Sequence, residues 1–506
     1  MAINQRKAGV ILSYGYILAQ AITVLLYQPL LMRSLGQSEY GLYSLMATVI
    51  NYMSILDMGM GEAIIMFTAK YRASHNTEAE KKLHGMFNRV FTVIGIISAA
   101  VGVILAFNAD YFFAESLTSD ELAKGKILML ILSFNIGMNF KYSIYGNIII
   151  ACERFVFSKL ISIVRTLLAP MIMVPILLLG GDSIWLVSVT CAVNVGCLLA
   201  NRYYAKTKLG IKVRFCGVDR NTVREIFTFS FFIFLAQIVD KVNWGVDQFI
   251  LGMFLGTEEV AVYSYAANYN QFILLLSATL SGIMLPKITA MLETGAQNKD
   301  ISREFIKFSR LQLYPILLAT AAFALVGKSF VMWHGGPDYE NSFYVALILI
   351  ISEVIPITQS VALATIKAKK KLAFWSYMTL ATAVANIVIS IPLAIRFGSV
   401  GSAIGTAITF MCANVVIMNI YYHKKIGIDI PRYWIELIRM VLGILPAIVI
   451  TYILKILFPI SGIGEFFVYA PVFVILFCLC AVTIVMNEYE KDMLRAIIKK
   501  ITRRLK

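Results

Sequence analysis

The segment LGQSEYGLYSL at residues 35–45 is followed 220 residues later by LGTEEVAVYSY at residues 255–265. Five of the eleven positions are identical at this constant offset, namely Leu35/Leu255, Gly36/Gly256, Glu39/Glu259, Tyr43/Tyr263 and Ser44/Ser264. The correspondence continues with Gly180/Gly398 and with Tyr203-Tyr204/Tyr421-Tyr422. A shared order of residues over such a distance indicates that the chain contains two copies of one structural unit.

The repeated unit belongs to a chain that is too apolar for a soluble protein. Of the 506 residues, 59% are hydrophobic and 15% are charged, and the mean hydropathy is +0.77, whereas soluble domains carry about 25% charged residues. Apolar stretches of about 20 residues, the length of a membrane-crossing helix, recur along the whole chain. We predict an all-α, polytopic membrane protein with fourteen spans, which begin near residues 8, 41, 90, 127, 160, 183, 226, 261, 311, 342, 373, 400, 440 and 466.

Spans one to six correspond to spans seven to twelve, which predicts two six-helix bundles. Because the repeated unit has an even number of spans, both copies cross the membrane in the same direction, as in transporters built from parallel repeats. The substrate path in such folds lies between the two halves. The predicted domains are an N-terminal bundle at 1–201, a cytoplasmic basic linker at 202–225, a C-terminal bundle at 226–422, and two extra helices with a basic tail at 423–506.

The distribution of the 45 Lys and Arg residues predicts the orientation of the chain. Most of them fall in alternate loops, and basic loops face the cytoplasm. We therefore expect both termini to be cytoplasmic and the first helix to be retained as a signal anchor. The basic tail would then lie against anionic lipid of the inner leaflet. The net charge of +16 is thus explained by membrane topology, and we expect no nucleic-acid partner.

The sequence carries no motif of a catalytic site. It lacks Walker A, HExxH and GxSxG patterns, its four histidines fall in predicted loops or at span ends, and its predicted outer loops are too short for a catalytic domain. The seven cysteines show no paired spacing, so we expect neither a disulfide nor a metal site. We predict that the chain is not an enzyme and has no cofactor, apart from a coupling ion such as H⁺ or Na⁺.

Charged residues deep in the spans are the candidates for function, because each costs about 2.5–3.5 kcal/mol at the bilayer centre. Five lie too deep to reach an interface easily, and these are Asp57, Lys141, Asp240, Lys241 and Glu353. Arg165 and Glu62 lie roughly 8–9 Å from a predicted span end and could extend to the interface. A structural ion pair or a buried hydrogen bond is the alternative explanation for the deep group.

Span seven has the densest polar pattern of the chain. The polar residues on or beside one of its helical faces are Gln237, Asp240, Lys241, Trp244, Asp247 and Gln248. The equivalent face of span one and the polar face of span eight contribute Gln20, Thr23, Gln28, Tyr263, Asn268, Asn270 and Gln271. We predict that these faces line a cavity that contains water.

A cavity that contains Lys141, Lys241 and Arg165 suits an anionic cargo, because a cation in a medium of low dielectric constant attracts phosphate strongly. Acidic residues cannot bind phosphate directly. They could hold the lysines in place, accept hydrogen bonds from sugar hydroxyls, or take up H⁺ or Na⁺. The candidates for ion coupling or gating are Asp57, Asp247 and Glu353.

Three runs resemble a known family. RSLGQSEYGLYSL from Arg33, LDMGMGEA from Leu56 and DQFILGMFLGTEEVAVYSYA from Asp247 are similar to the Wzx-type polysaccharide-biosynthesis flippases. These flippases belong to the multidrug/oligosaccharidyl-lipid/polysaccharide exporter superfamily, whose two six-helix bundles form a central cavity lined largely by helices one, two, seven and eight. The resemblance covers nearly the whole chain.

The resemblance implies translocation of an undecaprenyl-pyrophosphate-linked oligosaccharide, by alternating access, from the inner to the outer leaflet of the bacterial cytoplasmic membrane. The product would serve capsule, O-antigen or exopolysaccharide synthesis, and other polysaccharide assembly proteins are possible partners. The family's cavity cations correspond best to Lys141 and Lys241, and its acidic positions to Asp57 and Asp247. The residues expected to bind the substrate are Lys141, Lys241, Arg165, Asp240, Trp244, Asn268 and Gln271.

Two alternatives to a polysaccharide flippase stay open. A drug or cation exporter of the same superfamily would use the acidic residues, and the lysines would be incidental. A membrane scaffold of a polysaccharide assembly complex would gain nothing from deep charges, given their insertion cost. A lipid II flippase is less expected than either a capsule or an O-antigen flippase, because spans one, two and eight lack the deep arginine of that branch.

Overall fold

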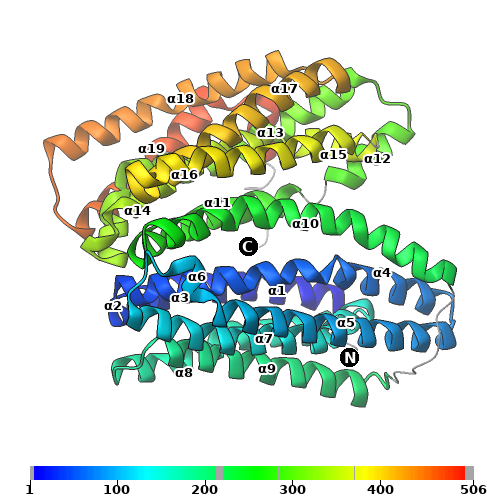
Figure 1. The fold of residues 1–506 in the computed structure, drawn as a ribbon. Coiled ribbons are helices and arrows are strands. Elements are labelled where there is room, and N and C mark those ends of the chain that lie inside the picture. The colour runs from blue at the N-terminus through cyan, green and yellow to red at the C-terminus, as the bar shows by residue number, and fades with distance from the viewer. Residues whose placement is uncertain (1–4, 212–219, 282–283, 370, 496–506) are drawn as a thin grey trace, which may run out of the picture. The chain divides into compact units, whose positions relative to one another are not determined.

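The computed structural model describes residues 5–211, 220–281, 284–369 and 371–495. Helices and short connections make up all of these residues, with no strand among them, which confirms the predicted all-α fold. The chain forms two compact units (Figure 1). Unit 1 comprises residues 1–264 with 394–398, and unit 2 comprises residues 265–393 with 399–506. The domain boundaries predicted from the repeat stay a prediction.

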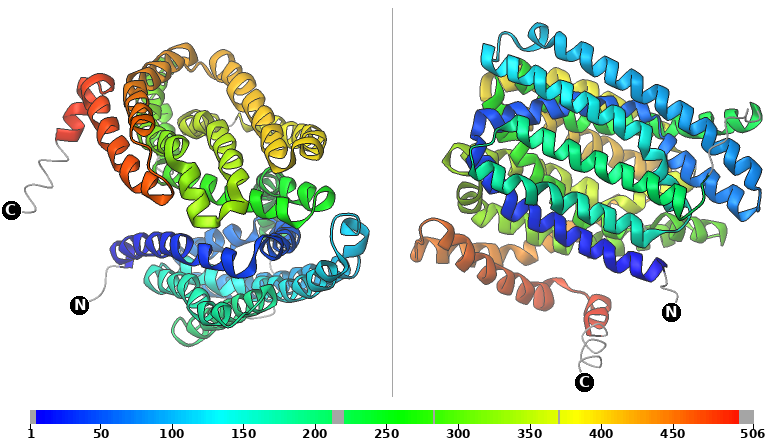
Figure 2. Two further views of the ribbon diagram at one scale, coloured as in Figure 1. Left: turned by 90° about the vertical axis from the view of Figure 1, so that its left-hand side faces the viewer. Right: turned by 90° about the horizontal axis from the view of Figure 1, so that it is seen from below.

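Unit 1 contains the elements up to the start of α11. They are α1 (Gln5–Ile22), η1 (Thr23–Tyr27), α2 (Gln28–Leu35), α3 (Gln37–Asn51), η2 (Tyr52–Asp57), α4 (Met60–Ala73), α5 (Thr77–Phe107), α6 (Ala109–Phe113), α7 (Ser119–Ala151), α8 (Phe155–Leu178), α9 (Ser183–Thr207), α10 (Arg220–Phe254) and the first residues of α11 (Thr257–Ser281). Within this unit, α7 packs against both α5 and α9, and the helices run side by side as a bundle (Figures 1 and 2).

Unit 2 contains the rest of α11 and the elements that follow it. They are α12 (Met284–Glu293), α13 (Asn298–Gly335), η3 (Pro337–Tyr339), α14 (Glu340–Thr358), α15 (Ser360–Ala368), α16 (Leu372–Phe410), η4 (Met411–Ile417), α17 (Met418–Tyr421), η5 (Tyr422–Ile426), α18 (Ile430–Leu457), α19 (Ile463–Cys480) and η6 (Ala481–Val485). The backbone of Gly398 is not helical, with φ 62° and ψ −146°, and it divides α16 into two helices.

Eleven helical stretches among the described residues are long and apolar enough to cross a membrane. One of them, Ala373–Ile426, has 54 residues and contains the interruption at Gly398, so it has the length of two spans. The helices α10 and α11 occupy the positions of the predicted seventh and eighth spans. The structure is therefore consistent with fourteen spans and with a multi-pass membrane protein.

The internal repeat is visible in the backbone. Gly36 and Gly256 precede α3 and α11 and have φ angles of 79° and 92°, a region that favours glycine because it has no Cβ. In unit 1, Glu39 accepts hydrogen bonds from the backbone N–H and the hydroxyl of Ser183, at 2.9 and 2.8 Å. Its repeat partner Glu259 occupies an equivalent place, because a methyl group at Gly398 would lie 2.9 Å from the Glu259 carboxylate. The identical residues of the two segments are therefore used to connect helices.

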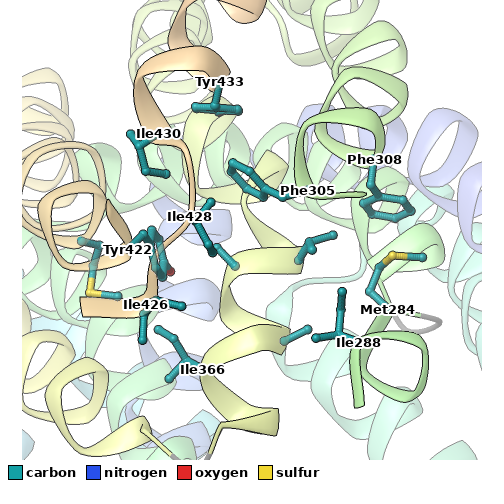
Figure 3. Packing of buried hydrophobic residues seen from close by; sticks show 14 residues of the cluster. Met284, Ile288, Phe305, Phe308, Ile366, Tyr422, Ile426, Ile428, Ile430 and Tyr433 are labelled. Atoms are coloured by element: carbon teal, nitrogen blue, oxygen red, sulfur yellow. The ribbon is translucent and has the colours of Figure 1, made fainter. Parts of the chain in front are cut away.

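The core of unit 2 gathers buried side chains from six helical elements, α12, α13, α15, α17, η5 and α18 (Figure 3). Its central members include the aromatic pair Phe305 and Tyr433, from α13 and α18, whose ring centroids lie 5.1 Å apart. Around them lie aliphatic side chains from α12, α15 and the connection that follows η5. A second cluster packs α18 and α19 against α13. The two extra C-terminal helices are therefore fixed to the rest of unit 2.

A buried ion network reinforces this attachment. The Arg310 guanidinium on α13 donates to both carboxylate oxygens of Glu490, each at 2.8 Å, and to Glu436 at 2.5 Å. The Tyr314 hydroxyl donates to Glu490 at 2.9 Å. Arg310 and Glu490 are almost fully buried. Hydrogen-bonded pairing compensates for the cost of burying these charges.

Candidate functional site

The run LDMGMGEA lies at a break in the second membrane stretch. This stretch, Gln37–Arg72, changes from α3 to the 3₁₀ turn η2 and then to α4. Between η2 and α4, Met58 and Gly59 adopt left-handed conformations with φ 49° and 69°. Such breaks expose backbone polar groups within a membrane, where they can bind ligands or ions. The second span is thus a discontinuous helix.

Asp57 lies at this break and faces the new helix start. Its Oδ2 accepts a hydrogen bond from the backbone N–H of Gly61 at 3.3 Å, and the side chain is half-buried. A carboxylate is favourable there because the first turn of α4 has unpaired N–H groups and a positive helix dipole. A methyl group at Gly61 would lie 3.3 Å from Asn147 Nδ2 and 3.5 Å from Asp57 Oδ2. Asp57 and Asn147 therefore lie next to the same glycine.

Lys141 lies on α7, six residues before Asn147, which is about 9 Å along the helix. Its side chain is exposed, with Nζ 5.5 Å from the centre of the Tyr142 ring. Among the described residues it has no ion-pair partner. An exposed, unpaired ammonium group ten residues from the end of its helix is available to an anion.

Asp247 is the most buried of the predicted acidic residues whose side chains the structure describes. Only 1% of its surface is exposed, and its Oδ2 accepts a hydrogen bond from the Tyr263 hydroxyl at 2.6 Å. The next residue, Gln248, accepts a hydrogen bond from Thr48 on α3. Two polar side chains of α10, Asp247 and Gln248, are therefore hydrogen-bonded to α11 and α3 within unit 1.

Tyr52 adds a polar group beside the same face. Its hydroxyl is buried and has no hydrogen-bond partner among the described residues. A methyl group at Gly245 would lie 2.6 Å from this hydroxyl, so the glycine lets η2 and α10 approach closely. Buried hydroxyls normally find a partner, and a polar ligand or water could supply one here.

Three of the predicted substrate-binding residues lie outside the described side chains. The backbone of Asp240, Lys241 and Trp244 is helical, within α10, but their side chains are not among those that the structure describes. The same holds for Gln237. The predicted stripe on span seven is therefore represented by Asp247 and Gln248.

The remaining predicted residues divide between the units. Arg165 is exposed on α8 in unit 1. In unit 2, Asn268 is half-buried and Gln271 is exposed, both on α11. Glu353 on α14 is 6% exposed and has no ion-pair or hydrogen-bond partner among the described residues. Whether all these residues share one site stays a prediction.

The structure corrects two details of the sequence interpretation. Gln28, predicted on an exposed face of span one, is buried and donates a hydrogen bond to the Tyr40 hydroxyl at 3.4 Å. His84, predicted in a loop or at a span end, lies inside α5, is buried, and is 3.1 Å from the Thr68 hydroxyl. Both residues are polar groups satisfied within unit 1, a distinction that residue spacing alone does not make.

Sequence analysis missed two buried polar groups of unit 2. One is the Arg310 network, because Glu436 and Glu490 follow more than 120 residues later in the chain. The other is the contact of His334, at the end of α13, with the hydroxyl of Tyr265 in the first half of α11. The sequence contains only a weak signal for the Arg310 network, because Arg310, Glu436 and Glu490 lie just outside predicted spans.

The sequence matches the family described as "Polysaccharide biosynthesis protein" over residues 7–292, more than half of the chain. The chain belongs to this family. All three runs that indicated the resemblance lie within the matched region, and the predicted relationship is confirmed.

Two relatives carry names that describe transport. A Shigella flexneri protein named as an O-antigen transporter is 20% identical over 396 residues, which cover 77% of this chain and 91% of the relative. A Haloferax volcanii protein named as a low-salt glycan biosynthesis flippase is 22% identical over 209 residues, which cover 40% of this chain and 43% of that relative. The first alignment extends over nearly the full length of the Shigella protein.

Solved transporters share the fold of this polysaccharide biosynthesis protein. The lipid II flippase MurJ, in its inward closed conformation, matches with a TM-score of 0.71 at 12% identity, over 96% of this chain and 100% of that chain. An inward-facing multidrug resistance MATE family transporter of the MOP superfamily matches with a TM-score of 0.64 at 14% identity, over 81% and 94%. At these identities the matches establish the fold.

Proposed function

We propose that this protein is a flippase that moves a polyprenyl-pyrophosphate-linked oligosaccharide from the inner to the outer leaflet of the bacterial cytoplasmic membrane. Membership in the polysaccharide biosynthesis family carries the proposal, and the Shigella relative, aligned over most of both chains, supports it. Alternating access would move the pyrophosphate and sugars through the protein while the polyprenyl tail stays in lipid. The lipid would be an undecaprenyl carrier for capsule, O-antigen or exopolysaccharide synthesis.

The cations are assigned to the pyrophosphate in this proposal. Lys141 and Lys241 are the principal ligands, with Arg165 as a third, because charge-assisted hydrogen bonds to phosphate are about twice as strong as neutral ones. The exposure of Lys141 and the lack of an ion-pair partner for it among the described residues support its assignment. The sugars would be bound by the polar and aromatic groups Asp240, Trp244, Asn268 and Gln271.

The membrane setting is part of the same proposal. Both termini lie in the cytoplasm, where the basic tail contacts anionic lipid and other polysaccharide assembly proteins can bind. The protein performs no chemical step on its cargo and needs no cofactor. Uptake of H⁺ or Na⁺ by Asp57, Asp247 or Glu353 drives or gates the cycle.

The decisive experiment reconstitutes the purified protein in liposomes that contain a fluorescent undecaprenyl-pyrophosphate-linked oligosaccharide. A membrane-impermeant quencher then reports the fraction of cargo in each leaflet. We expect protein-dependent flipping by the wild type and a loss of about tenfold or more in Lys141→Ala with Lys241→Ala, since hydrogen bonds to a charged group contribute about 1.5–3 kcal/mol each. The matched control is Lys208→Ala, an exposed lysine at the end of α9.

Two results would contradict the proposal. Folded wild-type protein that flips none of several such cargoes would transfer the assignment to the exporter or scaffold class. Export of an organic cation that is abolished by Asp240→Ala and unaffected by the double lysine variant would favour the exporter.

A further inference from the structure

Unit 2 contains a cavity that is lined by none of the residues assigned to the cargo. It has a volume of about 470 Å³ and lies where the first turns of α13 and α18 meet, within the size range of small-ligand pockets. Lys299 and Arg303 contribute from α13, His423 from η5, and Arg432 from α18. The walls thus carry three permanent cations, against one carboxylate, Asp429.

These cations are not neutralised within the structure. Lys299, Arg303 and Arg432 have exposed side chains and form no ion pair with any residue in the described ranges. The Asp429 carboxylate instead accepts from the backbone N–H of Arg432 at 3.2 Å, which caps α18. The His423 Nδ1 donates to the Ile428 carbonyl at 3.1 Å. The residues that line the cavity therefore carry a net positive charge that no partner among the described residues neutralises.

The loop that forms one wall is rigidly held. The Lys369 ammonium donates to the Ile426 carbonyl at 3.0 Å and to Asn298 Oδ1 at 2.9 Å. The Asp429 backbone N–H donates to the Ser302 hydroxyl at 3.0 Å. Below the loop, Ile426 and its isoleucine neighbours pack into the core of unit 2 (Figure 3). A preformed wall lowers the entropy cost of binding a ligand.

Unit 1 contains an equivalent cavity, whose cations are paired with carboxylates. Positions 77, 80, 81 and 84 of α5 line it with the same spacing as positions 299, 302, 303 and 306 of α13, and residues 209–211 replace the loop at 427–428. Here the cations are paired: Arg72 lies 3.3 Å from Glu80, and Lys81 lies 3.0 Å from Glu78. The repeat produced two cavities, and only the one in unit 2 has unpaired cations among the described residues.

The places of the lining residues in the sequence favour a ligand from the membrane surface. Basic residues lie at the start of α13 (Lys299, Arg303) and just before α18 (Lys424, Lys425), on the side that the charge distribution assigns to the cytoplasm. Trp434 on α18, two residues after Arg432, is partly buried against the same core, and tryptophan is typical of the headgroup layer. Arginine side chains bind phosphate in a bidentate manner.

We propose that this cavity, whose lining includes no residue assigned to the cargo, is a phosphate-binding site in which Arg303, Arg432 and Lys299 bind the phosphate of an anionic lipid headgroup or of a free phosphate. Arg303 and Arg432 approach the phosphate from two helices, and Lys299 adds charge at the rim. Occupation of the site joins the starts of α13 and α18 through the ligand. It thereby stabilises unit 2 whenever the anion is present.

The test measures ligand binding by the whole protein in detergent. Native mass spectrometry compares retention of dioleoyl phosphatidylglycerol with that of dioleoyl phosphatidylcholine, and thermal unfolding is followed with and without inorganic phosphate at constant ionic strength. We expect Arg303→Gln with Arg432→Gln to weaken binding about tenfold or more, since each hydrogen bond to a charged group contributes about 1.5–3 kcal/mol. Lys81→Gln in the unit 1 cavity is the matched control.

The outcomes distinguish the two sources of phosphate. Preferential retention of phosphatidylglycerol that is lost in the double arginine variant identifies a lipid site. Stabilisation by inorganic phosphate without lipid preference, also lost in that variant, identifies a site for free phosphate. The proposal is overturned if the wild type shows neither effect, or if Lys81→Gln loses binding as strongly.

Loss of binding in this test can be distinguished from loss of folding. The arginines are exposed and unpaired among the described residues, so their replacement is expected to leave the unligated unfolding temperature unchanged. Lys299→Glu provides an independent variant, in which charge reversal should weaken binding without removing either arginine. The basic tail is intact in every variant, so binding to the tail would persist in all of them and would contradict the proposal.

Discussion

At the scale of single residues, the contact between Tyr263 and Asp247 makes a direct prediction about stability. Tyr263→Phe removes a 2.6 Å hydrogen bond to a carboxylate that is 1% exposed. Loss of a donor to a buried charged group costs about 1–3 kcal/mol, and we expect the unfolding free energy to fall by that amount. Resistance to unfolding by SDS measures it. Tyr203→Phe, on an exposed tyrosine of α9, should cause no change.

The Arg310 network predicts how stability depends on pH. Burial alone would raise the pKa of Glu490, but hydrogen bonds from Arg310 and from the Asn487 backbone hold it below its usual value of 4.5. A depressed pKa contributes stability above the unfolded value, and this contribution is lost as the pH falls through the folded value. We expect the unfolding temperature of the wild type to fall below about pH 4.5.

The variant Glu490→Gln should remove this part of the pH dependence. It should also destabilise unit 2 at neutral pH by about 3 kcal/mol, because it leaves a buried arginine with one carboxylate partner fewer. Glu488→Gln makes the same change of charge on an exposed side chain two residues away and serves as the control. Parallel acid unfolding of wild type and Glu490→Gln would show that other carboxylates dominate.

At the scale of elements, the break at Met58 and Gly59 predicts a sensitive position in the second span. Gly59→Ala would place a Cβ on a left-handed residue, at a cost of roughly 1–2 kcal/mol. We expect lower stability together with slower flipping, because a continuous helix would displace Asp57 from its contact with Gly61. Gly196→Ala in α9, where a methyl group meets no atom within 4 Å, should change neither property. Unchanged transport by a destabilised Gly59→Ala would assign the break a structural role.

The elements also show how far the sequence predicts this structure. Hydropathy located the helices, and the repeat located the equivalent glycines, because both depend on local chain length and backbone conformation. The helix break was not predicted, because LDMGMGEA contains no proline and its apolar content continues the span. Whether a polar side chain faces a cavity or a neighbouring helix depends on tertiary packing, as Gln28 and His84 illustrate. The candidate site was therefore predicted as a set of residues, without their contacts.

At the scale of the whole molecule, a transport cycle needs a source of free energy. We predict that an ion gradient supplies it and that Glu353 takes up the ion. It is 6% exposed within α14 and has no partner in the described part of the chain. An ionised carboxylate in that environment is costly, so binding of H⁺ or Na⁺ is favourable. A site that releases the ion in one conformation and binds it in another couples the gradient to flipping.

We expect an inward gradient of H⁺ or Na⁺ to shift the equilibrium distribution of cargo between the leaflets. One pH unit supplies about 1.36 kcal/mol per proton, which is about tenfold in the leaflet ratio for one proton per cycle. In Glu353→Gln, cargo should still equilibrate but should no longer accumulate in the outer leaflet, because the amide cannot take up the ion. Glu340→Gln, at the exposed start of the same helix, should retain the response. If Glu353→Gln accumulates cargo in the outer leaflet to the wild-type ratio, Glu353 is not the coupling residue. If neither gradient changes the leaflet ratio of the wild type, cargo concentration alone drives flipping.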